Sequence, residues 1–389
     1  MLLEMIQGRL QVVAGTNEKL FERLADETTQ DLEYIDVFIT NHTNFVSSMQ
    51  FLNQLISRFY LEPSPGEYEY FMKWQRSIQL KVLNVIDRWI KVQHQNFMLD
   101  KPLHARLMLF LTENANFEFK NEVDKIKTSL ESKRLLLRPS PLLTPPGSPL
   151  PHRLLSSLEA KEMAKYLTLA DFHLLKSIQP YDLLNSRKVE EDEHDSIDMM
   201  TRRANMMSHW VIHEILNTTL AKPRRSLIKK FIEIAKLCLE WNNFHTSMVI
   251  TMGLLSAPIQ KLQETWTSLA NKDTNTFHSL QKLLDVSHNM RYYRQKVSTA
   301  KSPCIPFLPV ILKDRTFFKE GNASHLVSHP DLVNFSKFRL IQQFVNTTRH
   351  CTSEAYGFAG ELEQLGVVAD VLEGRLDAVK TCFHQCDLI

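Results

Sequence analysis

The stretch from residue 303 to residue 322 is the most informative part of this sequence, and it reads Pro303-Cys-Ile-Pro-Phe-Leu-Pro-Val-Ile-Leu-Lys-Asp-Arg-Thr-Phe-Phe-Lys-Glu320-Gly321-Asn322. The first two prolines fix φ and lack an amide donor, so we expect an extended entry until a helix begins between Phe307 and Pro309. Gly321 and Asn322 tolerate the left-handed conformation that ends many helices. The stretch therefore predicts a short helix, capped at both ends, with the acid Glu320 at its exposed tip.

The composition outside this stretch favours an all-α globular fold. The chain has 389 residues, 43% of them hydrophobic and 23% charged, which is enough for two or three domains. It has only 10 glycines, whereas average usage would give roughly 27. Because hairpin turns and barrels use glycine, this scarcity favours helices. The net charge of +2 with mixed signs predicts no basic face for nucleic acid.

Covalent and metal chemistry have no support in the sequence. The cysteines are odd in number and lack paired metal-ligand spacing, which is typical of reduced thiols in a cytosolic compartment: Cys238, Cys304, Cys351, Cys382 and Cys386. The acidic run around His194 is interpreted as a solvated loop. The motifs of phosphate-binding loops, dinucleotide sites and serine hydrolases do not occur in this sequence. No cofactor and no metal site are implied.

The ends of the chain carry weak targeting signals. The N-terminus lacks a basic region and a long apolar stretch, so we expect no signal peptide, and no apolar run reaches the roughly 20 residues of a membrane helix. Cys386-Asp-Leu-Ile389 has the C-a-a-X form of a prenylation site. Asp387 stands in an aliphatic position there, and an ordinary helix end is the alternative interpretation.

Residues 1 to about 135 are predicted to form amphipathic helices, with helix starts at Asp31 and Asn44. The segment from Ile78 to Ile90 is apolar on most faces, so we place it at the centre of a bundle. Six prolines between residues 136 and 153 then predict an extended linker. Within it, Ser140, Thr144 and Ser148 each precede a proline, the pattern of proline-directed phosphorylation.

Helical patterning returns after residue 154. Pro223 is predicted to end one helix, and residues 227–241 form a strongly amphipathic one that Asn242 and Asn243 close. Trp210, Phe244 and Phe335 are interpreted as core residues. Cys304 is interpreted as a small buried residue.

Several motifs of this second part resemble the catalytic domain of the guanine nucleotide exchange factors that act on Ras-type small GTPases. In chain order the matching segments are 167–184, 203–216 with its Arg203-Ala-Asn205…Ser208-His-Trp210-Val signature, 239–244, 289–294, 303–322 and 333–337. Segments 34–45, 52–60 and 78–90 resemble the Ras exchanger motif of the same family. The resemblance implies an exchanger-motif helical domain over residues 1–135, a linker over 136–153, and a catalytic domain over 154–389 that includes a protruding helical hairpin and a C-terminal helical tail.

The resemblance also implies a mechanism. In that family the hairpin levers switch 1 of the GTPase aside, near the phosphate and magnesium site, while other helices hold switch 2. Glu320 matches the family's acid, and Thr316, one turn earlier, matches the position that crowds the magnesium site. The implied activity is nucleotide exchange without covalent chemistry, on a GTPase of Ras, Rap or Ral type, by a cytoplasmic protein recruited to the membranes where that GTPase resides.

Contacts to the GTPase are implied at eight further positions: Arg202, Arg203, Leu255, Ser256, Lys313, Asp314, Gly321 and Asn322. The sequence departs from the family pattern at three places. Leu255 stands where an asparagine usually contacts the GTPase, Pro309 replaces a glycine, and Arg315 replaces a leucine. An alternative hypothesis is therefore a non-catalytic helical scaffold that binds a small GTPase or another signalling protein without exchanging its nucleotide.

Overall fold

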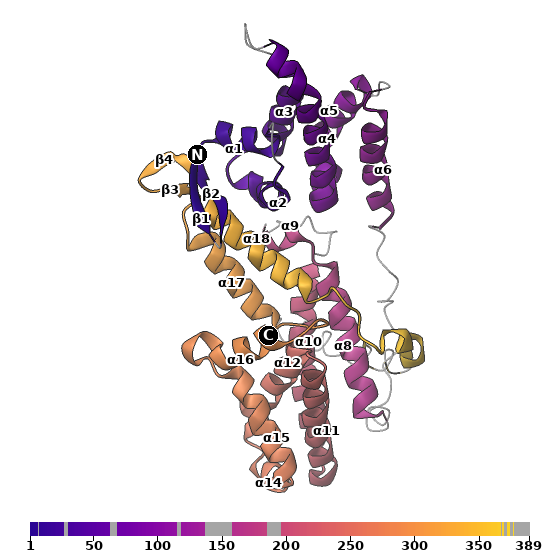
Figure 1. The fold of residues 1–389 in the computed structure, drawn as a ribbon. Helices are drawn as coiled ribbons and strands as arrows, with labels where there is room; N and C mark the ends of the chain where they lie inside the picture. The colour runs from indigo at the N-terminus through magenta and orange to yellow at the C-terminus, as the bar shows by residue number, and fades with distance from the viewer. Residues whose placement is uncertain are drawn as a thin grey trace, which may run out of the picture. The chain divides into compact units, whose positions relative to one another are not determined.

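The structure, a computed structural model, describes residues 1–6, 8–26, 30–62, 68–114, 118–136, 158–184 and 196–366, together with residues 368, 372, 373 and 376 (Figure 1). The chain forms two compact units. The first comprises Met1–Ser140 and Arg315–Val345, and the second comprises Pro141–Asp314 and Asn346–Ile389. The predicted domain limits stay predictions. The proline-rich linker, the acidic run and Cys386 lie outside the described residues.

Helices dominate the first unit, and side-chain caps mark the starts of α1, α2, α3 and α5. The helices are α1 (Asn17–Leu24), α2 (Leu32–Asn41), η1 (His42–Asn44), α3 (Ser48–Phe59), α4 (Tyr68–Leu99), α5 (Lys101–Glu113) and α6 (Lys120–Leu136). The Asp31 side chain accepts a hydrogen bond from the Tyr34 amide and caps α2, as predicted. The predicted start at Asn44 is wrong. Ser47 caps α3 instead, because its hydroxyl and the Gln50 side chain form a reciprocal capping box.

The predicted central helix is confirmed. Most of the apolar residues between Ile78 and Ile90 on α4 are buried, and Trp89 is fully enclosed. The Trp89 ring lies 4.4 Å from the ring of Phe51 on α3, and the His42 ring lies 5.1 Å from Trp89. Aromatic side chains packed in this way each bury a large apolar area.

Burial of His42 makes the stability of the first unit depend on pH. Burial lowers the pKa of His42 from 6.5 to about 4, against a hydrogen bond to the Ile39 carbonyl that raises it. In the unfolded chain His42 therefore becomes protonated as the pH falls through about 6.5. In the folded chain it becomes protonated only near pH 4. We expect the free energy of unfolding to fall by about 3 kcal/mol as the pH drops through this window.

Urea unfolding at pH 7 and pH 4.5, followed by circular dichroism, measures this loss. In His42→Gln the loss should shrink, because glutamine does not titrate, whereas the exposed His278→Gln should behave like the unaltered chain. An unchanged pH dependence in His42→Gln would contradict the assignment.

A small antiparallel sheet in the first unit was not predicted from the sequence. Its strands are β1 (Leu2–Ile6), β2 (Arg9–Gly15), β3 (His325–Leu326) and β4 (His329–Asn334), in the order β1-β2-β4-β3. The expectation that helices begin at the N-terminus is thus wrong for residues 2–15. Gly8, at φ 77°, adopts a left-handed conformation between the first two strands. The overall class remains helical, as predicted.

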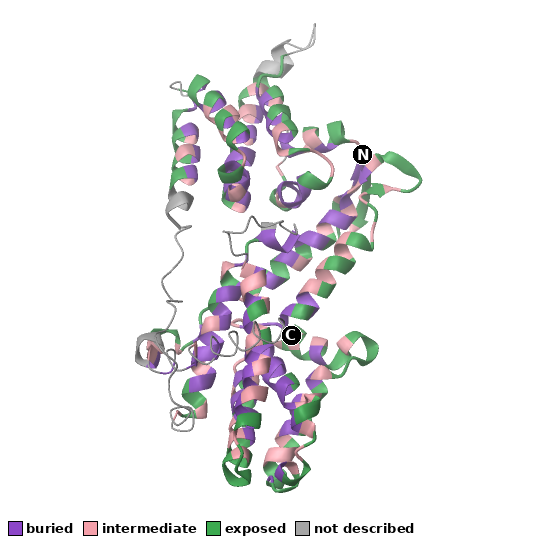
Figure 2. Ribbon diagram, turned by 180° about the vertical axis from the view of Figure 1, so that it is seen from behind, coloured by how far each residue is buried: buried purple, intermediate pink, exposed green. Residues whose placement is uncertain are grey.

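The second unit is built around α12 (Phe244–Leu254), in which every residue except Met252 is buried. Around it lie α8 (Ala160–Ser177), α9 (Pro180–Leu184), α10 (Ser196–Asn217), α11 (Ala221–Glu240), α13 (Ala257–Gln260), α14 (Gln263–Thr267), α15 (Asn271–Gln281), η2 (Lys282–Leu284), α16 (Ser287–Thr299) and η3 (Ala359–Leu365). Buried residues gather where helices pack together, and exposed ones on the outer faces (Figure 2). Trp210 and Phe244 in this unit, and Phe335 in the first, are core residues as predicted.

Pro223 does not end a helix. It is the third residue of α11, within the first turn. Amides in the first turn have no partner within the helix, so proline loses no hydrogen bond there.

The distinctive stretch forms α17 (Leu308–Glu320), which confirms the predicted start of the helix. The unit boundary falls inside α17, and a second boundary falls inside α18 (Phe335–His350). Within the first unit, Phe318 of α17 packs against Phe344 of α18 with ring centroids 5.6 Å apart. Among the helices that the structure describes, none combines the length and apolarity needed to cross a bilayer.

Candidate functional site

One face of α17 is exposed, and it carries both predicted catalytic residues. The exposed residues of the helix lie at helical spacing on a single stripe: Pro309, Lys313, Thr316, Phe317 and Glu320. Phe317 is 66% exposed, which is high for an aromatic side chain. Leu308, Val310 and Ile311 are buried. The structure thus brings Thr316 and Glu320 together, one turn apart, on the exposed stripe of α17.

The end of α17 differs in detail from the prediction. Neither Gly321 nor Asn322 has a positive φ, so neither residue adopts the left-handed conformation. The predicted left-handed cap is therefore wrong. Glycine is required for another reason: the Gly321 amide donates to the Phe317 carbonyl at 2.8 Å, and a Cβ at residue 321 would lie 2.5 Å from that oxygen.

A lysine of α18 lies within electrostatic reach of Glu320. Burial lowers the pKa of the Lys337 ammonium, and the Glu320 carboxylate opposes that effect. Lys337 donates to the Ser324 hydroxyl at 3.1 Å. Glu320 itself stays exposed, so its charge is available at the tip of the helix.

The first half of α17 is clamped to α16. Arg294 donates to both carboxylate oxygens of Asp314, at 2.7 and 2.6 Å, a bidentate geometry that fixes direction as well as distance. Lys313 donates to the Asn289 side-chain oxygen at 2.9 Å. Two of the predicted GTPase contacts, Lys313 and Asp314, are therefore engaged within the chain.

The start of α16 adopts an uncommon backbone conformation. His288, Asn289 and Met290 have φ between 50° and 58°. Left-handed conformations in non-glycine residues cost of order 1–3 kcal/mol each and persist only where surrounding contacts enforce them. Here Arg294 donates to the Asn289 carbonyl at 2.8 Å, in addition to its bonds with Asp314.

The chain that leads into α17, residues 301–307, is called the entry segment. It is bonded to the α11–α12 turn (Trp241–Asn243). The Ile305 amide donates to the Asn242 carbonyl at 2.9 Å, and the His245 amide donates to the Ile305 carbonyl at 3.2 Å. Asn242 has φ 57° at the end of α11, and Asn243 caps α12, so the predicted capping by both residues is confirmed. Cys304 is buried, as predicted.

Two buried aromatic side chains accept hydrogen bonds from backbone amides where the entry segment joins α17. The Phe307 amide donates to the Tyr293 hydroxyl at 2.7 Å, and the Leu308 amide donates to Nδ1 of His245 at 3.3 Å. Burial raises the pKa of Tyr293 and lowers the pKa of His245. Both side chains therefore stay neutral near pH 7, and His245 keeps its acceptor nitrogen free of a proton.

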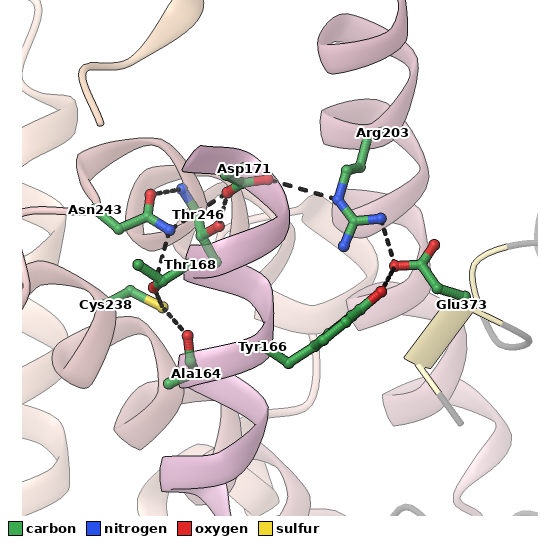
Figure 3. Close-up of polar contacts among 9 residues, drawn as sticks. All are labelled: Ala164, Tyr166, Thr168, Asp171, Arg203, Cys238, Asn243, Thr246 and Glu373. Carbon is green, nitrogen blue, oxygen red and sulfur yellow. Dashed lines mark hydrogen bonds and ion pairs between the residues drawn. The ribbon is translucent and has the colours of Figure 1, made fainter. Parts of the chain in front are cut away.

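A buried polar network lies beneath the α11–α12 turn (Figure 3). Asp171 of α8 is 1% exposed, and its carboxylate accepts from the Thr246 hydroxyl and from the Asn243 side-chain amide, the latter at 3.4 Å. Asn243 in turn accepts from the Thr246 amide at 2.9 Å. Sequence reasoning missed Asp171, although a single acid among the apolar residues of the buried face of α8 was a signal for it.

The two predicted arginines lie in different environments. Arg202 is exposed and pairs with Asp198 one turn earlier on α10. Arg203 is only 5% exposed and pairs with Asp171 and Glu373, at 3.5 and 2.6 Å. Burial alone would lower the pKa of Arg203, but these two carboxylates raise it instead. Arg203 therefore has a structural environment, and only Arg202 keeps a surface position.

Leu255 and Ser256 end α12 and begin α13, and both are half-buried. The Ser256 hydroxyl oxygen has no hydrogen-bond partner among the described residues. Gly253 allows α12 to approach α10 closely, since a Cβ there would lie 3.0 Å from the Ser208 carbonyl.

Among the described residues, no group of three or more His, Cys, Asp or Glu side chains is arranged to hold a metal ion. The candidate site is the exposed stripe of α17, on a helix whose first half is bonded to α16.

Comparison with known proteins agrees with this description. Residues 162–339 match the RasGEF domain and residues 11–110 match the RasGEF N-terminal motif. Together the two matches cover most of the chain. The chain belongs to the family of Ras-type guanine nucleotide exchange factors.

Curated relatives carry the same family name. The chain is 30% identical over 376 residues to Ras guanine nucleotide exchange factor J of Dictyostelium discoideum, covering 89% of this chain and 44% of that protein. It is 29% identical over 364 residues to factor R of the same organism, covering 89% and 20%. It is 26% identical over 379 residues to Cell division control protein 25 of Candida albicans, covering 92% and 28%. The chain thus spans less than half the length of these relatives.

Proposed function

We propose that this chain is a guanine nucleotide exchange factor that accelerates GDP release from a Ras-family small GTPase. It does so by inserting the helical hairpin near switch 1 and the phosphate and magnesium site, without covalent chemistry. One observation carries the proposal: the exposed stripe of α17 places Thr316 and Glu320 one turn apart at the end of a helix whose base is clamped. Family membership supports the same activity.

The physical basis of exchange is thermodynamic coupling. A protein that binds the nucleotide-free GTPase more tightly than the nucleotide-bound form must weaken nucleotide binding by the same factor. Magnesium and phosphate are held largely by charge, so a carboxylate brought to the phosphate-binding lysine competes directly with the nucleotide. Glu320 is that carboxylate in our proposal.

The other exposed residues of the stripe have steric and apolar roles. Thr316 crowds the magnesium site, and Phe317 supplies apolar area that a partner can cover. The remaining contacts of the GTPase are assigned to Arg202, Leu255, Ser256, Gly321 and Asn322. Lys313 and Asp314 support the base of α17 and reach the partner only if their bonds to α16 open.

The alternative is a helical scaffold that binds a small GTPase without exchanging its nucleotide. Leu255 favours this alternative, because an apolar side chain replaces the family's asparagine at a half-buried position. The two hypotheses differ in which form of the GTPase binds best.

Binding measurements separate the two hypotheses. Immobilised GTPases of Ras, Rap and Ral type are titrated with the chain after removal of nucleotide and again with GDP bound. Exchange requires tighter binding to the nucleotide-free form of at least one GTPase, and reversal of that binding by added GDP. Equal affinity for both forms of every GTPase that binds would favour the scaffold.

The type of GTPase and the cellular location belong to the same proposal. We assign a Ras, Rap or Ral type partner and action in the cytoplasm, at membranes where that GTPase is anchored. Prenylation of Cys386 and phosphorylation of Ser140, Thr144 or Ser148 concern residues outside the described part of the chain.

A further inference from the structure

We infer that Glu373, in the C-terminal segment, is a positioning residue for α17, acting through Arg203, Asp171 and the α11–α12 turn. The inference rests on the proposed function only for its effect on exchange. Glu373 lies beyond residues 162–339, which match the RasGEF domain, so the match does not include it. Figure 3 shows the side chains that connect it to the α11–α12 turn.

The first step is a buried charge cluster. Glu373 accepts from Arg203 at 2.6 Å and from the Tyr166 hydroxyl, also at 2.6 Å. Burial and the charge of Glu373 both raise the pKa of Tyr166, so the phenol stays protonated and remains a donor. Leu372 and Leu376, on either side of Glu373, are almost fully buried.

The second step joins this cluster to Asp171. Arg203 lies between two carboxylates, and the guanidinium Nε is 3.5 Å from Asp171. A buried guanidinium must keep its partners, because an unpaired charge in the interior is strongly unfavourable. If Glu373 loses its charge, Arg203 keeps Asp171 as its remaining carboxylate partner and draws that carboxylate away from Thr246 and Asn243.

The third step reaches α17. Thr246 and Asn243 are the capping residues at the start of α12, and Asn243 lies beside Ile305 in a parallel bridge. A shift of the α11–α12 turn therefore moves the entry segment and the His245 acceptor of the Leu308 amide. These bonds hold Leu308, the first residue of α17, against α12 within the second unit.

The chain supplies a matched control. Glu361 is another acid of the C-terminal region, and it also pairs with a residue of α8, Lys165. The side chain of Glu361 is 43% exposed, and the described contacts of Lys165, with Glu361 and with the Phe358 ring, do not involve Asp171 directly. Glu361→Gln therefore removes a C-terminal carboxylate that pairs with α8, and it leaves Glu373, Arg203 and Asp171 unaltered.

The test compares Glu373→Gln with Glu361→Gln in the full chain by amide hydrogen exchange. We expect the Ile305 and Leu308 amides to exchange about tenfold faster in Glu373→Gln, with the amides of α15 unchanged as internal reference. Glu361→Gln should change all of them less than about twofold. Unchanged exchange at Ile305 and Leu308, or equal acceleration in α15, would overturn the inference.

A second readout depends on the proposed function. We expect Glu373→Gln to lower the kcat of nucleotide release about fivefold while KM changes little, because the partner surface is intact but α17 is misdirected. If no GTPase responds to the unaltered chain, the proposed function fails while the hydrogen-exchange result still decides the inference.

A milder variant covers the case in which Glu373→Gln does not fold. Tyr166→Phe removes one hydrogen bond to Glu373 and leaves every charge in place. We expect the same pattern with a smaller increase, about threefold at Ile305 and Leu308. No change at these two amides in Tyr166→Phe, with Glu373→Gln unfolded, would also count against the inference.

Discussion

Replacing Glu320 by alanine is expected to slow the chain's acceleration of nucleotide release by roughly tenfold to a hundredfold, while the helical content stays the same. The carboxylate is exposed at the end of α17, so its removal leaves no cavity, and the buried Lys337 keeps its hydrogen bond to the Ser324 hydroxyl. What is lost is a charge-assisted contact in the GTPase complex, and such contacts contribute about 1.5–3 kcal/mol. One factor of ten in rate corresponds to about 1.4 kcal/mol.

Two control variants sharpen this prediction. Glu320→Gln keeps the shape and removes the charge, so it should resemble Glu320→Ala if charge is what displaces the nucleotide. Glu264→Ala removes an exposed acid from α14, away from α17 in the sequence, and should leave the rate unchanged. The rate is read from the fluorescence of mant-GDP released from the GTPase. A Glu320→Ala chain as active as the unaltered one would remove Glu320 from the mechanism.

Replacing Asp171 by alanine is expected to lower the free energy of unfolding of the second unit by roughly 3–5 kcal/mol, the usual cost of breaking a buried ion pair from one side. Asp171 is 1% exposed. Its carboxylate forms an ion pair with Arg203 and accepts hydrogen bonds from Thr246 and Asn243. Alanine removes one carboxylate partner of the Arg203 guanidinium, and it removes an acceptor of the Thr246 hydroxyl and of the Asn243 side-chain amide. All three groups lie in the interior, where water does not take the place of the lost carboxylate.

The control for Asp171 is an ion pair on the surface of the same unit. Asp198→Ala breaks the exposed pair with Arg202, and we expect it to cost less than about 1 kcal/mol. Midpoints of urea unfolding, followed by circular dichroism, measure both variants. Equal shifts in the two midpoints would mean that the buried network contributes no more than a surface pair.

Much of the fold was predictable because its determinants are local. The apolar face of α4, the amphipathic pattern of α11 and the prolines before α17 each act within a few turns of chain, and so do the caps Asp31 and Asn243. The sheet was not predictable in the same way. Ala14 of β2 pairs with Asn334 of β4, 320 positions later, and no local pattern reveals that partner.

The same distinction applies to the candidate site. The helical spacing of Thr316 and Glu320 is a local property, so the sequence already placed them on one face. Arg203 is buried beside Glu373, which lies 170 residues later in the chain. Because that partner is distant in sequence, the sequence alone did not distinguish Arg203 from a surface arginine. The reason for glycine at residue 321 lies only one turn away, at the Phe317 carbonyl, but it depends on the exact path of the backbone and not on a residue pattern.

The rate of mant-GDP release from Ras-, Rap- and Ral-type GTPases, with and without the full chain, tests the central claim most directly. We predict that the chain accelerates release from at least one of them, and that the acceleration saturates with GTPase concentration as expected for a catalyst. Unchanged release from every GTPase, under conditions where binding is detected, would contradict the account and leave the scaffold as the function.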